Sequence, residues 1–272
     1  YMNLQQMDIM TIKQCGIVEY ILIVSLNGGK QKNNNSNLLK AGIALMFATS
    51  VLSGKSNIVL LSELQSRAYV DMTVSVLEKF GVIIKKTEQG YEIEGRQRLL
   101  SPGEYIVEGD WSNAAFFIVG AALAGNVKIT GLDMNSKQSD KVILDILKLI
   151  GVEFIIDGDT VSVKKSEIKP FDLDVSECPD LFPILAVLAS GAKGKTTLYN
   201  ARRLRIKESD RITSTKELIL SLGGKAEETE ESLIIYGTGK LVGGNVKSFN
   251  DHRIAMSAFI ASCICDETIV LD

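Results

Sequence analysis

A dense group of cations marks the segment between Asn200 and Arg211. It reads Asn-Ala-Arg-Arg-Leu-Arg-Ile-Lys-Glu-Ser-Asp-Arg, and its basic residues are Arg202, Arg203, Arg205, Lys207 and Arg211. A loop that only balances the charge of nearby acids is one explanation. The segment also leads into a helix that we expect to begin at Ser209-Asp210, where free backbone N–H groups attract anions. The pattern therefore favours binding of a small polyanion.

Two carboxylates and a further arginine could complete such a site. Glu208 lies inside the basic segment, and Asp180 precedes the apolar stretch Leu-Phe-Pro-Ile-Leu. Carboxylates near cations either neutralise charge or exchange protons, and Asp180 could also be a simple helix N-cap. Arg253 follows the chain's single histidine, His252, at another expected helix start. A guanidinium suits bidentate capture of a carboxylate or phosphate, whereas a lone histidine is usually structural or orienting.

These residues belong to an internal repeat of about 70 residues. Aspartates precede apolar helical stretches at Asp110, Asp180 and Asp251, at intervals of 70 and 71 residues. Each stretch is followed by a β-rich segment, and the β-rich segments begin at Gly54, Gly125, Gly194 and Thr268. A second helix and two short alternating runs complete the unit. The order helix, strand, helix, strand, strand predicts an α/β fold with helices packed on sheet faces.

The second helix of each unit carries its own boundary signals. A second aspartate recurs near its expected start, at Asp71, Asp140 and Asp210. Its expected end is a glycine in a left-handed cap, at Gly81, Gly151 and Gly223. Both helices of a unit therefore begin at polar residues, where backbone N–H groups and partial positive charge collect.

Composition indicates a compact protein, and its length allows one or two domains, of which we expect two. The chain has 272 residues, of which 46% are hydrophobic and 23% charged, enough for a sizeable core. A net charge of -3 argues against a protein covered by nucleic acid. The apolar run at 17–26 is interrupted by Glu19 and is too short to span a bilayer, so we expect a buried strand. The polar run at 30–37 predicts a loop.

The cysteines match neither a zinc-binding spacing nor a disulfide framework. They are Cys15, Cys178, Cys263 and Cys265. A Cys-x-Cys pair alone falls short of a tetrahedral ligand set. We therefore expect no metal, and reduced thiols in the core of a cytoplasmic protein.

Five motifs, taken together and in order, resemble those of the 5-enolpyruvylshikimate-3-phosphate (EPSP) synthase family, the 3-phosphoshikimate 1-carboxyvinyltransferases. They are Gln65-Ser-Arg-Ala-Tyr-Val-Asp71, Val107-Glu-Gly-Asp110, Pro179-Asp180, Lys207-Glu-Ser-Asp-Arg211 and Asp251-His-Arg253. The similarity runs from about Ser53 to the end of the chain. It implies a two-domain enolpyruvyl transferase-like fold, an inside-out α/β barrel of βαβαββ units. By that resemblance, residues 1–107 are the remnant of the shikimate-phosphate-side domain, and residues 108–272 form the second domain.

The resemblance also implies a reaction and a role for each matching residue. Enolpyruvyl would pass from phosphoenolpyruvate to the 5-hydroxyl of shikimate 3-phosphate, with release of phosphate, in the shikimate pathway to chorismate and the aromatic amino acids. Asp180 and Glu208 would be catalytic, and Glu208 would carry the proton for C3. Shikimate 3-phosphate would contact Ser66, Tyr69, Asp180, Arg203 and Lys207, and phosphoenolpyruvate would contact Lys207, Arg211 and Arg253. No cofactor, metal, nucleic acid or membrane is implied, and we expect a monomer.

Several motifs of that family do not occur in the chain. Its opening Lys-Ser, its Asn-Ala-Gly-Thr loop and its C-terminal lysine are missing, and Leu38-Leu39-Lys40 stands where its Ser-Ser-Gln triplet is expected. We therefore expect an incomplete chain with one incomplete domain. An inactive fragment or scaffold of the fold is one alternative, and a UDP-N-acetylglucosamine enolpyruvyl transferase is another. An RNA-terminal phosphate cyclase is a third, but 6% aromatic residues offer few stacking positions for RNA.

Overall fold

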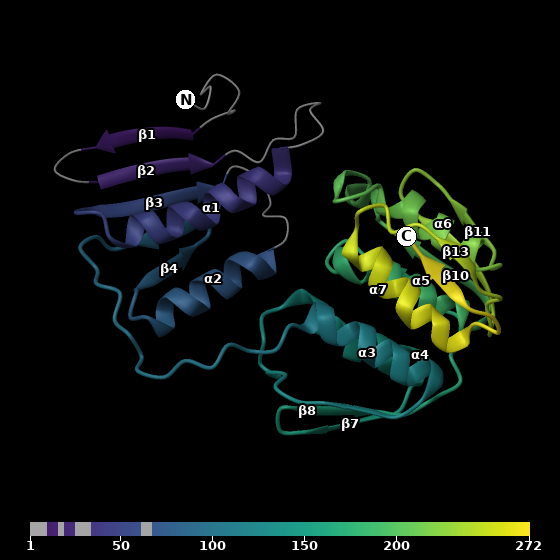
Figure 1. Ribbon diagram of the computed structural model, residues 1–272. Helices are drawn as coiled ribbons and strands as arrows, with labels where there is room; N and C mark the ends of the chain where they lie inside the picture. The colour runs from purple at the N-terminus through teal and green to yellow at the C-terminus, as the bar shows by residue number, and fades with distance from the viewer. Residues whose placement is uncertain (1–9, 16–18, 25–33, 61–66) are drawn as a thin grey trace. The chain divides into compact units, whose positions relative to one another are not determined.

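The structure, a computed structural model, describes residues 10–15, 19–24, 34–60 and 67–272 (Figure 1). The chain divides into two compact units, Tyr1–Val107 and Glu108–Asp272. Each unit has a hydrophobic core of its own.

The described residues of the first unit form one five-stranded sheet and two helices. Its elements are β1 Met10–Cys15, β2 Glu19–Val24, α1 Asn34–Ser50, β3 Lys55–Leu60, α2 Arg67–Lys79, β4 Ile84–Thr87 and β5 Gly90–Ile93. The strand order is β1-β2-β3-β5-β4, in which only β2 and β3 run parallel. Helix α1 packs on α2, and buried side chains from both helices and the sheet, including Met46, Val70 and Ile93, form the core.

The second unit repeats the same succession of elements. They are α3 Trp111–Ala124, β6 Val127–Ile129, α4 Ile143–Ile150, β7 Phe154–Asp157, β8 Thr160–Val163, β9 Asp172–Asp174, α5 Phe182–Ser190, β10 Lys193–Tyr199, α6 Arg211–Ser221, β11 Ala226–Glu228, β12 Leu233–Thr238, β13 Gly244–Val246, α7 His252–Ala261 and β14 Ile269–Leu271. Short 3-10 helices precede three of these helices and one strand, at Ser139–Val142, Pro179–Leu181, Arg202–Ile206 and Ser262–Ile264.

Sheet topology confirms the predicted repeat. In each of three copies the first strand pairs with the third, and the third pairs with the second, giving the orders β3-β5-β4, β6-β8-β7 and β10-β12-β11. In two of these copies a preceding strand lies parallel to the first strand, in the pairs β2–β3 and β9–β10. The pair β13–β14 repeats this arrangement at the end of the chain. Two described copies are therefore whole βαβαββ units, β2 to β5 and β9 to β12.

Helices occupy the centre of the second unit, with sheets outside them (Figure 1). Helix α5 packs against α3, α6 and α7 and against strands β10 and β12, and each of its residues is buried. Such a helix must be apolar on all sides, which explains the sequence Phe-Pro-Ile-Leu-Ala-Val-Leu-Ala-Ser. The arrangement agrees with the inside-out α/β architecture predicted from the motifs.

Several expected boundaries are confirmed, and others are wrong. Gly81, Gly151 and Gly223 have φ values of 84°, 80° and 77°, the left-handed conformation predicted for helix ends. The predicted loop at 30–37 is wrong for its last four residues, because α1 begins at Asn34. Asp71 does not begin a helix either: it lies one turn inside α2, 3.7 Å from the Nε of Arg67.

The cysteines are only partly where we predicted them. Cys178 is buried, as expected for a core thiol, but Cys263 is exposed and Cys265 is half-buried. The prediction is wrong for Cys263 because it follows the last turn of α7, where the chain leaves the core. Within the described ranges, no three His, Cys, Asp or Glu side chains are grouped to hold a metal, and no helix is long and apolar enough to cross a membrane.

The contact between β12 and the end of α5 leads to the first prediction. A Cβ at Gly237 would lie 2.2 Å from the carbonyl oxygen of Ala189 and 2.5 Å from that of Ala192. Gly237→Ala should therefore lower the free energy of unfolding by about 3 kcal/mol, as overpacking of a core does. Gly125→Ala is the control, since no atom lies within 4 Å of its added Cβ; its effect should stay within about 1 kcal/mol. Equal urea denaturation midpoints for the two variants would contradict the packing argument.

Candidate active site

The aspartates that open the three central helices have different structural roles. Asp110 is the N-cap of α3, and its Oδ1 accepts hydrogen bonds from the backbone N–H groups of Ser112 and Asn113. Asp251 caps α7 in the same way through the N–H of Arg253. Asp180 instead lies in the 3-10 helix before α5, and the N-cap of α5 is the next residue, Leu181. The simple N-cap explanation is therefore wrong for Asp180, and its carboxylate contacts side-chain cations.

The centre of the site is the buried guanidinium of Arg211, in the first turn of α6. Its Nη1 lies 2.6 Å from Oδ1 of Asp180, and its Nε lies 2.9 Å from Oδ2 of Asp251. Its Nη2 donates to Oε2 of Glu208 at 2.5 Å. Arg211 and Asp251 are both fully buried, so this pair is shielded from water. One arginine thus joins the starts of α6 and α7 to the segment before α5.

Two more cations contact Asp180. The Nζ of Lys207 lies 3.5 Å from Oδ1, and the Nη2 of Arg253 lies 3.4 Å from Oδ2. The Nη1 of Arg253 also donates to the backbone carbonyl of Asp180, at 3.4 Å. Lys207 comes from the corner between β10 and α6, and Arg253 comes from the first turn of α7. Asp180 is therefore the point where cations from two successive repeats meet.

Electrostatics keep these groups charged. Burial alone would raise the pKa of Asp180, but the charges of Arg253, Lys207 and Arg211 outweigh it and lower the pKa to about 2. Burial likewise opposes ionisation of Asp251, and the bonds from Arg211 lower its pKa. Burial would lower the pKa of Arg211, which the bonds and charges of Asp251 and Asp180 raise instead. At neutral pH the site is therefore a set of ion pairs.

The formal charges of the cluster cancel. Lys207, Arg211 and Arg253 supply the cations, and Asp180, Glu208 and Asp251 supply the anions. The acids differ in exposure: the side chain of Glu208 is 51% exposed, that of Asp180 11%, and that of Asp251 is fully buried. Glu208 is thus the acid that an incoming anion can displace most readily.

The structure brings together five of the predicted site residues, Asp180, Glu208, Lys207, Arg211 and Arg253. Arg203 lies in the same corner; burial lowers its pKa, against the charge of Glu177, and its contact with substrate stays a prediction. Tyr69 is a partly exposed residue of α2 in the other unit, and Ser66 lies outside the described residues. His252 is exposed at the first position of α7.

The basic corner does not act as one group of cations, as its sequence suggested. Arg202 is 72% exposed and pairs with Glu230. Arg205 is bonded to Asp210 and to backbone carbonyls of the β11–β12 turn. Arg202 and Arg205, which were not among the predicted site residues, therefore serve other partners.

Sequence reasoning missed the part that two aspartates, Asp251 and Asp140, play at the site. Asp251 was recognised only as a helix opener, although it also holds Arg211 and accepts from the Oγ of Ser209 at 3.0 Å. Asp140 is a buried carboxyl that accepts a hydrogen bond from Ser112. Both aspartates stand at repeat positions visible in the sequence, but their partners are distant in the chain and could not be deduced.

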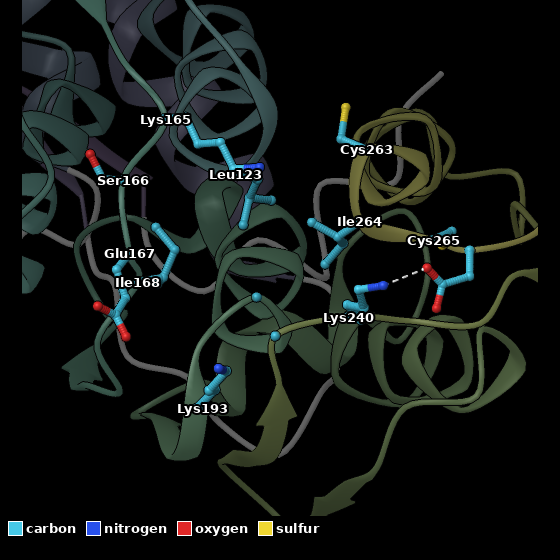
Figure 2. A pocket seen from close by; sticks show the side chains of 13 residues that line it. Leu123, Lys165, Ser166, Glu167, Ile168, Lys193, Lys240, Cys263, Ile264 and Cys265 are labelled. Carbon is cyan, nitrogen blue, oxygen red and sulfur yellow. Dashed lines mark hydrogen bonds and ion pairs between the residues drawn. The ribbon is translucent and has the colours of Figure 1, made fainter.

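A separate cavity lies away from this cluster. It has a volume of about 400 Å³ and is lined by Leu123, Gly191, Lys193, Lys240, Cys263 and residues near them (Figure 2). The cavity lies at the carboxyl ends of α3 and α5, where helix dipoles disfavour anions. Its Lys240 is already paired with Asp266, at 2.9 Å. The cavity contains none of the predicted site residues, so we assign the chemistry to the Arg211 cluster.

Comparison with known proteins agrees with this geometry. The sequence model of EPSP synthase (3-phosphoshikimate 1-carboxyvinyltransferase) matches residues 32–272. The chain belongs to the EPSP synthase family. It is 44% identical over 241 residues to the 3-phosphoshikimate 1-carboxyvinyltransferase of Clostridium novyi, covering 88% of this chain and 55% of the relative. The Methanocorpusculum labreanum enzyme of the same name is 42% identical, with 84% and 54% covered.

Solved structures of the EPSP synthase family and related transferases have the same fold. An EPSP synthase structure from Acinetobacter baumannii aligns with a TM-score of 0.74 and 28% identity, covering 93% of this chain and 57% of that one. The enolpyruvyl transferase NikO from Streptomyces tendae aligns with a TM-score of 0.67 and 19% identity, covering 85% and 53%. The chain therefore spans about half the length of the relatives it matches.

Asp140 provides a test of the electrostatics beside Asp180. Burial, with the charges of Asp180 and Asp110, raises its pKa to about 6, against the Ser112 hydrogen bond and the charge of Arg253. The native state therefore binds the proton more tightly than the unfolded chain, and stability falls as the pH rises from about 3.8 to about 6. Asp140→Asn removes this penalty, so it should raise the free energy of unfolding by on the order of 2 kcal/mol at pH 7.5.

Urea denaturation at pH 4 and at pH 7.5 measures this effect. At pH 4 the difference between Asp140→Asn and wild type should nearly vanish, because the native carboxyl is then protonated. Asp145→Asn is the matched control, since it removes a 72% exposed acid of α4. The explanation fails if Asp140→Asn changes stability equally at both pH values.

Proposed function

We propose that the protein transfers the enolpyruvyl group of phosphoenolpyruvate to the 5-hydroxyl of shikimate 3-phosphate, releasing phosphate. The observation that carries the proposal is the convergence of Lys207, Arg211 and Arg253 on Asp180 and Glu208. The names of the relatives support the same reaction. We assign it to the shikimate pathway of aromatic amino acid biosynthesis, in the cytoplasm, with a monomeric protein and no cofactor.

The cations answer an electrostatic problem that this reaction poses. Both substrates carry phosphate, and phosphoenolpyruvate also carries a carboxylate, so the two repel each other in water. Lys207, Arg211 and Arg253 would bind phosphoenolpyruvate, and Lys207 would also reach shikimate 3-phosphate. Orienting two reactants in this way can lower the activation free energy by about 7 to 11 kcal/mol. Cations fixed by surrounding ion pairs need little rearrangement as charge moves during the reaction.

Besides Lys207, four residues would contact shikimate 3-phosphate. Asp180 would contact its ring hydroxyls, and Arg203 would lie beside it in the cationic corner. Ser66 and Tyr69 would contact its phosphate and ring. Arg203 is partly buried and Tyr69 is partly exposed, so part of each side chain is packed against protein and part is accessible to a ligand.

Substrate must exchange with acids that now hold the cations. The Nη2 of Arg211 is occupied by the half-exposed Glu208, and the Nη1 is occupied by Asp180. A phosphate or carboxylate oxygen that takes the place of Glu208 on Arg211 would release that side chain toward the substrate. Asp251 would stay in place, because an unpaired buried carboxylate costs several kcal/mol.

The released acids then have distinct roles in the reaction. The 5-hydroxyl oxygen forms a bond to C2 of phosphoenolpyruvate, and Asp180 accepts the hydroxyl proton. Glu208, which would take up a proton from solvent once a substrate anion replaces it on Arg211, gives that proton to C3. The resulting tetrahedral adduct loses phosphate from C2, and Glu208 takes a proton back from C3. Asp180 is a weak base while its pKa is about 2. Substrate anions that neutralise Lys207 and Arg253 would raise its basicity at the moment it is needed.

Calorimetric titration and a phosphate-release assay test the proposal. The chain should bind shikimate 3-phosphate, then phosphoenolpyruvate, and release phosphate only when both are present. UDP-N-acetylglucosamine replaces shikimate 3-phosphate in a parallel assay. Phosphate release from phosphoenolpyruvate with the UDP sugar, but not with shikimate 3-phosphate, would assign the chain to the other transferase. Failure to bind either substrate would identify it as an inactive fragment of the fold.

Replacing Glu208 separates proton transfer from binding. Glu208→Gln keeps the size of the side chain but removes its exchangeable proton, so turnover should fall by at least about 100-fold, the lower range for a general acid. Affinity for shikimate 3-phosphate should stay within a few fold of wild type. The control is Glu230→Gln, which removes an exposed acid from the neighbouring turn. Equal losses of affinity and turnover would mean that Glu208 acts only as a counter-charge.

A further inference from the structure

Arg205 holds three separate segments together. Its Nε donates to the carbonyl oxygen of Glu230 at 2.8 Å, and its Nη2 donates to that of Thr229 at 2.6 Å. Its Nη1 donates to Oδ2 of Asp210 at 2.9 Å and to Oγ1 of Thr213 at 3.4 Å. These partners lie in the β11–β12 turn and at the start of α6. The guanidinium therefore ties the cationic corner to a hairpin on one side and a helix on the other.

Most donors of Arg205 are engaged by protein, because four of its five N–H groups donate to protein oxygens. A guanidinium has N–H groups on all three nitrogens, and here each nitrogen faces a protein oxygen. Glu228 adds a carboxylate 3.8 Å from Nη2, and 26% of the arginine side chain is exposed. Only one N–H group of Arg205 is left for an anionic substrate, so its main contacts are with protein, which separates it from Lys207 and Arg211.

The bond to Asp210 closes the loop that carries the reactive groups. Residues 206–209, which include Lys207 and Glu208, lie between Arg205 and Asp210. Asp210 is also fixed from the other side, because its Oδ1 accepts from the N–H of Thr213 as the N-cap of α6. The loop is therefore short and is held at both ends, so the backbone positions from which Lys207 and Glu208 extend are restrained.

We propose that Arg205 is a positioning residue, which sets the places of Lys207 and Glu208 against Asp180 and Arg211 by closing the loop at 206–209. This inference rests on the proposed function, because it assigns Arg205 an effect on the reaction without contact with substrate. Lysine cannot replace it: an ammonium group can meet Asp210, but it cannot hold two carbonyls and a carboxylate in one plane.

Crystal structures and kinetics of Arg205→Lys test the inference. In the variant, the distance from Nζ of Lys207 to Oδ1 of Asp180, 3.5 Å in the wild type, should increase by about 1 Å or more. A displacement of that size can cost about 100-fold in kcat. Arg202→Lys is the matched control in the same corner, because Arg202 is 72% exposed and has one exposed ion pair. Arg202→Lys should leave the distance unchanged and keep kcat within a few fold of wild type.

Asp210→Asn provides a second variant if Arg205→Lys does not fold. The asparagine oxygen can still cap α6, whereas the charged bond to Arg205 is lost. An unmoved Lys207 in the crystal of either folded variant overturns the inference, as does a kcat equal to that of Arg202→Lys. A role limited to stability would lower the melting temperature without either change. A wild-type chain with no turnover refutes the proposed function separately, and the position of Lys207 then still decides whether Arg205 fixes the loop.

Discussion

The buried guanidinium of Arg211 is the interaction on which the rest of the site depends. An unpaired buried charge costs several kcal/mol, so a fully buried arginine persists only with anionic partners of good geometry. Those partners come from three places in the chain: Asp180 before α5, Glu208 in the corner before α6, and Asp251 at the start of α7. Loss of any one would leave charge uncompensated beside the core. The same ion pairs therefore hold these helices together and form the proposed site.

The internal repeat explains how residues 70 apart come to share a site. Each repeat contributes a central helix whose apolar body is buried and whose start is polar, so packing the helices together gathers their first turns. Arg253 of one copy touches Asp180 of the preceding copy, which is direct evidence that the starts of α5 and α7 adjoin. Helix N-termini also carry partial positive charge, which adds to the attraction for anions. A core made of helices with sheets outside thus gathers helix N-termini and cations at one end as a consequence of its own packing.

The sequence predicted the repeat and its glycines because those signals are local. Left-handed backbone at Gly81, Gly151 and Gly223 follows from the end of a helix, wherever that helix packs. The motif Lys207 to Arg211 likewise identified, by type and spacing, residues that the structure brings together with Asp180. What could not be predicted depends on distant partners: Asp180 resembles an N-cap until Arg211 and Arg253 are placed beside it, and Arg205 resembles an anion ligand until the β11–β12 turn occupies it. The start of α1 within a polar run was missed because Asn and Ser favour caps and turns over helix interiors, so the run carries no local helix signal.

The different exposures of the three acids set the order in which an arriving anion would displace them. Asp251 is fully buried and caps α7, so its displacement would cost both a cap and a buried ion pair. Asp180 contacts three cations and can lose one of them while it keeps the others. Glu208 is half-exposed and is held by the one arginine, so it is the cheapest partner to replace. Under the proposed reaction, this order means that an arriving anion releases the proton-transferring acid first and leaves the structural acid in place. Binding and activation would then be the same event, because the exchange that seats the substrate also frees the group that must act on it.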